Sequence, residues 1–116
     1  MKTENDWKAA KERSRVPEMY RWDLTHIYPA DAAWSEAKEG LRANLPRLGE
    51  FRGKLGSGPS ALADFLDLMT ECGKTYARLY CYASMRSDED TREAGPTGME
   101  QEMGQLGADF SALTAF

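Results

Sequence analysis

The single histidine, His26, is the residue of this chain best suited to general acid-base chemistry or to metal binding. A zinc peptidase site would need further ligands at fixed spacing, such as the two histidines of an H-E-x-x-H helix. The sequence holds no second histidine and no C-x-x-C pair. We therefore expect a partly exposed imidazole in a turn, and we assign no catalytic and no metal-ligating residue.

The two cysteines, Cys72 and Cys81, could in principle form a disulfide or bind a metal. They are nine residues apart, which places them on opposite faces of one helix at about 100° per residue, so they cannot bridge within it. We expect buried, reduced thiols. The acidic run 88–90 lacks the mid-loop glycine and the closing glutamate of a calcium loop, and we interpret it as a solvated turn.

Three tyrosines, Tyr76, Tyr80 and Tyr82, lie close together in a helical pattern and could form a contact surface for a peptide or another domain. Core packing explains Tyr76 and Tyr80 equally well. Tyr82 falls off the main apolar stripe, so we predict that it faces outward or contacts a second partner. The candidate contact residues are therefore Tyr82 and Tyr80.

The N-terminal 30 residues show little regular periodicity. Residues 1–14 are charged around a lone Trp7, and we expect a charged helical turn or a loose, fraying arm there. Residues 15–30 contain Pro17 and Pro29 and predict an extended, aromatic-rich segment.

The first predicted helix begins after Asp31, which is a good N-cap residue. Pro46 removes a backbone donor, so we expect a kink or a break near Asn44–Leu45, which could divide the helix in two. Apolar residues recur along this segment at steps of three and four: Trp34, Ala37, Leu41, Leu45, Leu48, Phe51 and Leu55.

Two further helices follow a glycine-rich linker. The second is predicted over about residues 60–86, and an acidic turn over 87–96 follows it. The third is predicted to start at a capping box of Thr97 and Glu100 and to continue to Phe116. The second helix carries the clearest apolar stripe: Leu62, Phe65, Leu66, Met69, Cys72, Tyr76, Leu79, Tyr80 and Ala83.

These elements predict an all-α fold, an antiparallel helical hairpin or bundle of three to four helices behind the aromatic-rich segment. With 116 residues, 41% hydrophobic and 29% charged, the chain is one domain at most. A net charge of −4 argues against nucleic-acid binding. The sequence contains neither a membrane-spanning apolar run nor a signal-peptide pattern, which favours a cytoplasmic protein.

The last helix predicts that the chain is part of a longer domain. It ends on the apolar run Leu113–Phe116 without a stop signal. The stripes of the second and third helices can face each other, but each is wide enough for another partner. We therefore expect a domain truncated within its last helix, and self-association when it is made alone.

Three segments carry a resemblance to a known family. They are RVPEMYRWDLTHIYP at 15–29 with the following DAAW, LPRLGEFRGKL at 45–55 and LYCYASMRSDEDT at 79–91. Together they resemble the N-terminal region of the oligoendopeptidase F family, zinc metallopeptidases related to thimet oligopeptidase. Beyond Arg92 the likeness weakens at Gly95–Pro96. The residues most typical of the family form a structural signature: Tyr20, Trp22, Asp23, Leu24, Tyr28 and Trp34.

The resemblance implies a structural role, with no catalytic residue in this sequence. In the family, this region is a helical domain that packs on the catalytic domain and helps to wall a channel for short peptides. The zinc ligands and the catalytic glutamate lie far downstream, so none is carried over to this sequence. The resemblance therefore divides the chain into an N-terminal arm and aromatic-rich segment at 1–30 and a helical domain at 31–116. It also implies that the zinc belongs to the parent enzyme and that the chain alone has no peptidase activity. A free-standing helical-hairpin interaction module is the competing interpretation.

Overall fold

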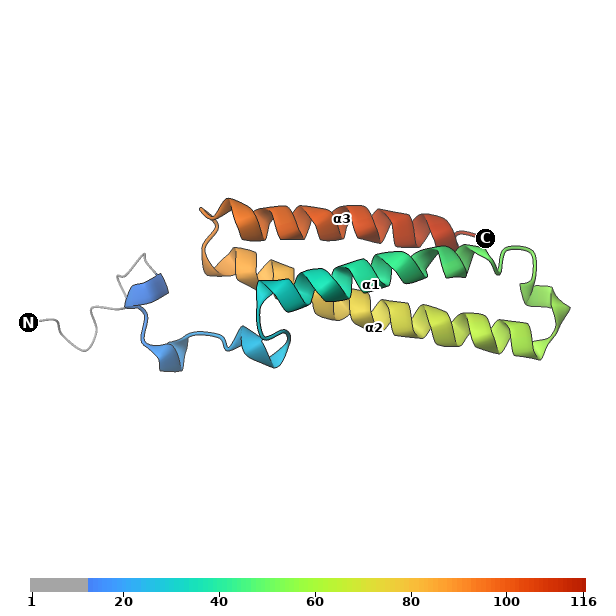
Figure 1. The fold of residues 1–116 in the computed structure, drawn as a ribbon, viewed down its shortest axis with the longest axis horizontal. Coiled ribbons are helices and arrows are strands. Elements are labelled where there is room, and N and C mark those ends of the chain that lie inside the picture. Colours follow the sequence, from blue (N-terminus) through green and yellow to red (C-terminus); the bar gives the residue numbers. More distant parts are fainter. Residues whose placement is uncertain (1–12) are drawn as a thin grey trace, which may run out of the picture.

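The computed structural model describes residues 13–116, and every regular element within that range is a helix (Figure 1). The long helices are α1 (Asp31–Gly49), α2 (Pro59–Glu89) and α3 (Ala94–Thr114). Short 3-10 turns, η2 to η5, cover Arg13–Arg15, Glu18–Tyr20, Leu24–His26 and Leu55–Ser57. The prediction of an all-α fold is confirmed. The predicted arm with Trp7 lies outside the described residues, except for its last two positions.

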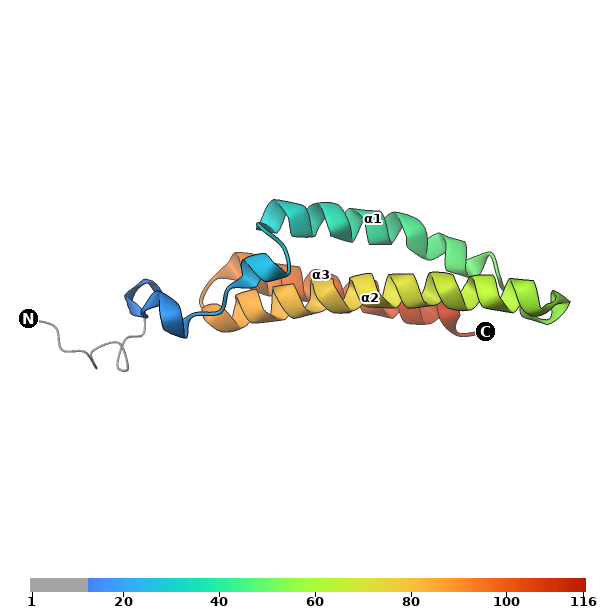
Figure 2. The ribbon, with the colours of Figure 1, turned by 90° about the horizontal axis from the view of Figure 1, so that it is seen from below.

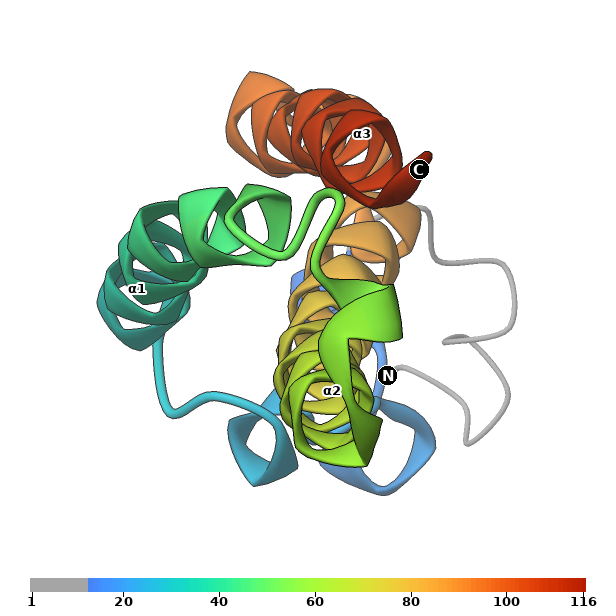
Figure 3. The ribbon, with the colours of Figure 1, turned by 90° about the vertical axis from the view of Figure 1, so that its right-hand side faces the viewer.

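The three long helices form a bundle in which each one contacts the other two (Figure 3). The chain runs along α1, returns along α2 and runs forward again along α3, so α2 is antiparallel to both neighbours (Figures 1 and 2). This arrangement is the up-down-up packing that short helix-helix connections favour. Because the helices alternate in direction, the last turns of α2 lie beside the start of α1.

The start and the course of α1 differ from the sequence prediction. Ala30, in extended conformation, occupies the N-cap position, and Asp31 is already the first helical residue. The helix also passes through Pro46 without dividing and ends at Gly49. Pro46 and Arg42 are both exposed, so the Arg42 carbonyl that loses its helical donor faces water. Phe51 and Leu55, expected on the same helix, therefore lie beyond its end.

The boundary between α2 and α3 also corrects the prediction. α2 begins with Pro59 in its first turn and extends to Glu89, which shortens the predicted acidic turn to residues 90–93. α3 already begins at Ala94, so Gly95 and Pro96 belong to its first turn. The predicted capping box is wrong, because the Thr97 hydroxyl donates to the Glu93 carbonyl at 3.1 Å.

The core takes side chains from all three long helices. Its five largest fully buried side chains are Trp34, Leu48, Leu79, Met103 and Leu106. Trp34 contributes a polar contact as well, because its indole Nε1 donates to the Leu79 carbonyl of α2 at 2.9 Å. Lys38 is buried beside it, with its ammonium 5.1 Å from the Trp34 ring centre and paired with Glu102 of α3. Trp34 and Lys38 therefore connect α1 to both other helices.

The N-terminal segment consists of short 3-10 turns rather than the predicted extended chain. Leu24 and Tyr28 reach the core, whereas Tyr20 and Trp22 are 55% and 51% exposed. Asp23 caps the turn at Leu24, since its carboxylate accepts from the Thr25 amide at 3.1 Å. None of the helices within 13–116 combines the length and the apolar character required to span a bilayer.

Candidate functional site

Tyr82, one of the two predicted contact residues, lies inside the molecule. It is 3% exposed, so the expectation that it faces outward is wrong. Its hydroxyl donates to Asp31 Oδ1 at 2.7 Å, and its ring meets that of Tyr28 edge-on with 5.6 Å between centres. Tyr82 lies off the stripe defined by its neighbours because it faces the start of α1 and the segment before it.

Arg86 completes this contact one turn further along α2. Its guanidinium donates to both carboxylate oxygens of Asp31, at 3.2 and 3.1 Å, and to Glu89 at 3.4 Å. Glu89 in turn pairs with Arg13 at 2.9 Å. We call Arg13, Asp31, Tyr82, Arg86 and Glu89 the polar cluster. It joins the N-terminal segment, the start of α1 and the end of α2.

The electrostatics of the polar cluster favour fixed charges over proton transfer. The hydrogen bond from Arg86 lowers the pKa of Asp31, and the same bond raises the pKa of Arg86. Burial, followed by the bond to Asp31, raises the pKa of Tyr82 to about 12. The carboxylate, the guanidinium and the neutral phenol therefore keep their states near neutral pH. The cluster is suited to holding elements together.

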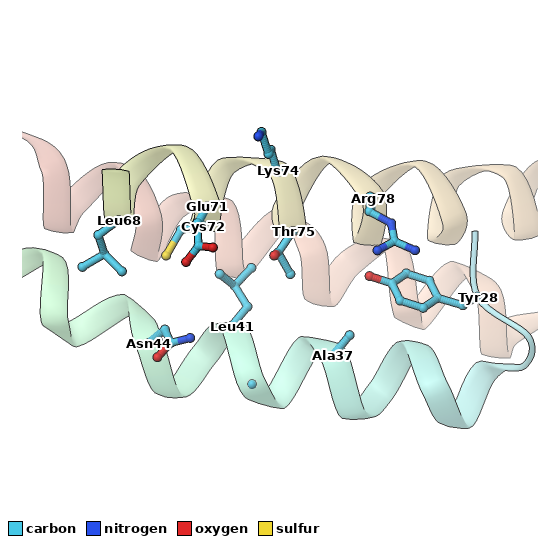
Figure 4. Close-up of a pocket in the computed structure, with 11 residues that line it drawn as sticks. Tyr28, Ala37, Leu41, Asn44, Leu68, Glu71, Cys72, Lys74, Thr75 and Arg78 are labelled. Atoms are coloured by element: carbon cyan, nitrogen blue, oxygen red, sulfur yellow. The ribbon is translucent and has the colours of Figure 1, made fainter. Parts of the chain in front are cut away.

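A cleft of about 540 Å³ lies between α1 and α2 (Figure 4). Leu41 projects into it from α1, and Cys72 and Thr75 project from α2, whereas Lys74 points away from α1 (Figure 4). Arg78 closes one end, where its guanidinium is 4.9 Å from the Tyr28 ring centre and donates to the Ile27 carbonyl at 2.7 Å. The full lining is Tyr28, Ala37, Gly40, Leu41, Asn44, Leu68, Glu71, Cys72, Lys74, Thr75 and Arg78.

The α1–α2 cleft does not combine a nucleophile with a base. Cys72 is its one thiol, and burial raises the pKa of that thiol, which keeps it protonated and unreactive. Arg78 is already engaged by the backbone and by Tyr28. The cleft offers mixed polar and apolar contact area and no assembled catalytic group.

Between Leu62 and Cys81, the side of α2 that faces away from α1 is exposed and carries no charge. Leu62 is 43% exposed, Leu66 50% and Tyr80 44%, although all three belong to the predicted core stripe. At 100° per residue, the exposed uncharged positions span about a third of the circumference of the helix. We call them the uncharged face: Leu62, Ala63, Leu66, Met69, Thr70, Ala77, Tyr80 and Cys81.

A groove of about 430 Å³ runs beside the uncharged face, between α2 and α3. Tyr76 forms its wall, stacks on Tyr80 with 6.2 Å between ring centres, and donates its hydroxyl to the Met103 carbonyl at 3.2 Å. Gly104 and Gly107 leave the floor of the groove open, and a Cβ added at Gly107 would lie 2.5 Å from the Tyr76 hydroxyl. Tyr80 is therefore the predicted contact residue that is available to a partner.

The donors present do not fit a zinc site. The His26 side chain is 82% exposed in its turn, as expected, and its nearest acidic partner is Asp23 at 3.2 Å. Across residues 13–116, no three His, Cys, Asp or Glu side chains gather closely enough to hold a metal ion. Cys72 and Cys81 are both free thiols, but only Cys72 is buried, so the prediction for Cys81 is corrected.

Over residues 13–116, the fold and these contacts define a helical scaffold that carries the polar cluster and the uncharged face. Sequence comparison then gives its relatives. The chain is 31% identical over 105 residues to oligopeptidase PepF of Bacillus subtilis. This match covers 90% of the chain and 16% of PepF. It is 32% identical over 108 residues to plasmid oligoendopeptidase F of Lactococcus lactis subsp. cremoris. That match covers 92% of the chain and 18% of the relative.

A third relative, group B oligopeptidase PepB of Streptococcus agalactiae, is 28% identical over 104 residues, covering 90% of the chain and 17% of the relative. No family model matches the chain, and neither does any solved structure. The chain is related to the oligoendopeptidase F family, as the resemblance predicted. It spans about a sixth of the length of the curated relatives it matches.

Sequence reasoning missed two features of the candidate site. The polar cluster was not foreseen, because Asp31 was interpreted as an N-cap and Arg86 lies 55 residues away from it in the sequence. Four residues of the uncharged face were included in the predicted core stripe: Leu62, Leu66, Met69 and Tyr80. A signal for it was present, since every charged residue of α2 between 64 and 78 lies outside the uncharged arc.

Proposed function

We propose that this chain is the non-catalytic, N-terminal helical region of an oligoendopeptidase F-like zinc metalloendopeptidase that hydrolyses short peptides. The similarity to oligopeptidases over nine-tenths of the chain carries the proposal. The match covers about a sixth of each relative, which leaves most of such a protein to supply the reactive centre.

In such an enzyme the helical region would pack on the catalytic domain and help to wall the channel that admits peptides. The bundle suits this role because its polar cluster holds the start of α1 and the end of α2 in place. A rigid wall limits the size of the substrate through its shape, without reacting groups of its own. Peptides would meet the α1–α2 cleft only within the assembled enzyme, where Tyr80 would contact a peptide or another domain. A cytoplasmic location of that enzyme is part of this proposal.

The zinc chemistry would belong to the rest of the parent enzyme. A zinc ion polarises the peptide carbonyl and activates a water molecule for attack. The residues described here do not fit the metal, so no step of that reaction is assigned to them. The chain alone is expected to show no peptidase activity and no stoichiometric zinc.

Two experiments test this proposal. Extending the reading frame that contains the sequence should reveal an H-E-x-x-H helix downstream of position 116. The purified 116-residue chain should leave a short fluorogenic peptide intact, whereas the longer product should cleave it and lose that activity to a chelator. Chelator-sensitive cleavage by the 116-residue chain itself would contradict the proposal, as would a reading frame without the metal-binding helix.

A free-standing helical-hairpin interaction module is the second candidate function. The uncharged face favours it, since exposed apolar residues at helical spacing are what a partner helix would bind. This candidate and the parent-enzyme proposal both predict self-association of the isolated chain at high concentration. A stop codon close after position 116 would favour the interaction module over the peptidase region.

A further inference from the structure

We propose that the uncharged face is the surface on which the remainder of the longer polypeptide docks, through an uncharged helix of that remainder. This inference rests on the proposed function and adds to it the face, the partner element and the orientation of the bundle. The α1–α2 cleft, on the charged side of α2, would then stay open to solvent or to the channel.

The charge distribution around α2 supports this orientation. Charged residues of α2 between 64 and 78 all lie outside the arc of the uncharged face, and Glu71 and Arg78 line the cleft. The uncharged face would cover about 28 Å of the helix from Leu62 to Cys81. Burying an unpaired charge against such a surface is costly, so its partner must also be uncharged.

The groove beside the face indicates what the partner inserts. Gly104 and Gly107 leave about 430 Å³ between α2 and α3, with the Tyr76 ring as one wall. That volume admits a large apolar side chain from an approaching helix. The stacked ring of Tyr80 lies at the rim, where an aromatic side chain contributes contact area and a polar tip.

The size of the face favours an occupant from the same polypeptide over a second copy. A strip of about 28 Å by roughly 10 Å presents about 300 Å², whereas a stable dimer buries about 800 Å² on each partner. A covalently linked partner needs less area, because linkage gives it a high effective concentration. The curated relatives are about six times as long as the matched segment, which supplies such a partner.

Cys81 provides a built-in probe of this docking, because it is an exposed free thiol at the edge of the uncharged face. We would measure its alkylation rate by mass spectrometry in the 116-residue chain and in the longer polypeptide. An Ala43→Cys variant serves as the control, since Ala43 is exposed on α1. Alkylation of Cys81 should slow on the order of tenfold or more in the longer polypeptide, while the thiol at position 43 keeps its rate.

Each other outcome overturns the proposal. An unchanged rate at Cys81 would show that the face stays uncovered, and equal slowing at both positions would show that coverage is not specific to it. Protection of Cys81 in the longer polypeptide that is lost on dilution would identify a second copy as the occupant. The alkylation rate does not depend on peptidase activity. A longer polypeptide that protects Cys81 but cleaves no peptide would refute the proposed function and leave the docking intact.

A matched pair of substitutions gives a second test. Ala77 lies on the uncharged face and Ala43 on α1, and both alanines are exposed within a helix. Ala77→Glu should leave the helicity of the 116-residue chain unchanged and restore the alkylation of Cys81 in the longer polypeptide. Ala43→Glu should change neither. Persistent protection of Cys81 in Ala77→Glu would contradict docking through this face.

Discussion

The two sides of α2 differ in what covers them: one side packs against other parts of the chain, and the apolar residues of the other side are exposed to solvent. Toward α1, the polar cluster gives each charged group a partner within the chain, and the Trp34 indole bonds the Leu79 carbonyl. On the opposite side, Leu62 and Leu66 are among the exposed large apolar residues of the chain. The comparison teaches that an apolar stripe identifies what is to be buried, and that it leaves open whether the same chain does the burying.

The most sensitive test of this difference is to truncate the side chains of two adjacent residues of α2. Phe65 is 7% exposed and packs edge-on against Phe51, whereas Leu66 is 50% exposed. Phe65→Ala should reduce the free energy of unfolding by about 3–5 kcal/mol, and Leu66→Ala by less than about 0.5 kcal/mol. Urea denaturation followed by circular dichroism measures both. Equal losses would mean that the uncharged face is already covered in the chain.

Removing the centre of the polar cluster should give the next largest effect. Asp31→Ala leaves Tyr82 and Arg86 without their shared acceptor and should cost about 1.5–3 kcal/mol. Asp67→Ala, which removes an exposed carboxylate of α2, should cost less than about 0.5 kcal/mol. Thermal unfolding at neutral pH compares the two. Similar melting temperatures would argue that the cluster does not stabilise the fold.

The same carboxylate predicts an acid dependence. Because the pKa of Asp31 is lowered in the folded protein, its contribution to stability is present above the pKa of the unfolded chain, about 3.9. That contribution is lost as the pH falls through the lowered folded value. Stability measured by urea titration from pH 6 to pH 2 should therefore fall less steeply in Asp31→Ala than in the unmodified chain. Parallel curves would contradict this assignment.

Two glycines of α3 sharpen the comparison at the groove. A Cβ at Gly107 would lie 2.5 Å from the Tyr76 hydroxyl, whereas one at Gly104 would meet nothing within 4 Å. Gly104→Ala should stabilise the helix by up to about 1 kcal/mol. Gly107→Ala should be about 1–2 kcal/mol less stable than Gly104→Ala, because Tyr76 must give up its bond to Met103. Denaturation midpoints of the two variants measure the difference.

The smallest expected effect at neutral pH concerns Tyr82 itself. Its raised pKa of about 12 means that the neutral phenol is favoured in the folded state. The associated stability is fully present below pH 10, the usual value for tyrosine, and is lost as the pH rises toward 12. Absorbance titration of phenolate should show one late-titrating tyrosine that is missing in Tyr82→Phe. Tyr80→Phe, a change on the uncharged face, should leave that late step in place.

The helices could be predicted because their signals are local. Spacing alone indicated three long helices, and the Pro59 that begins α2 was visible in the sequence. The exact ends were harder, since Asp31, Pro46 and Thr97 each have a common local role that another contact or solvent exposure replaced. For Thr97 that contact is itself local, to the Glu93 carbonyl four residues back. Local rules rank what a residue prefers, and packing decides between preferences of about 1 kcal/mol.

The candidate site was less predictable, because its contacts join distant residues. Tyr82 and Asp31 are 51 positions apart, and nothing in the periodicity of α2 indicates that the start of α1 lies opposite. Tyr80 and Tyr82 were chosen together, yet the helix turns by about 200° between them, which places one in solvent and one in the interior. The family resemblance identified the relatives but not which tyrosine is accessible.

The Trp34–Leu79 hydrogen bond has a consequence for synthesis. Its two ends are 45 residues apart, and Trp34 leaves the ribosome first. At about 5–20 residues per second, the indole waits roughly 2–9 seconds before its acceptor carbonyl has been translated. During that interval α1 has no α2 to cover it, so the nascent chain presents its largest aromatic ring to whatever binds apolar surface at the tunnel exit.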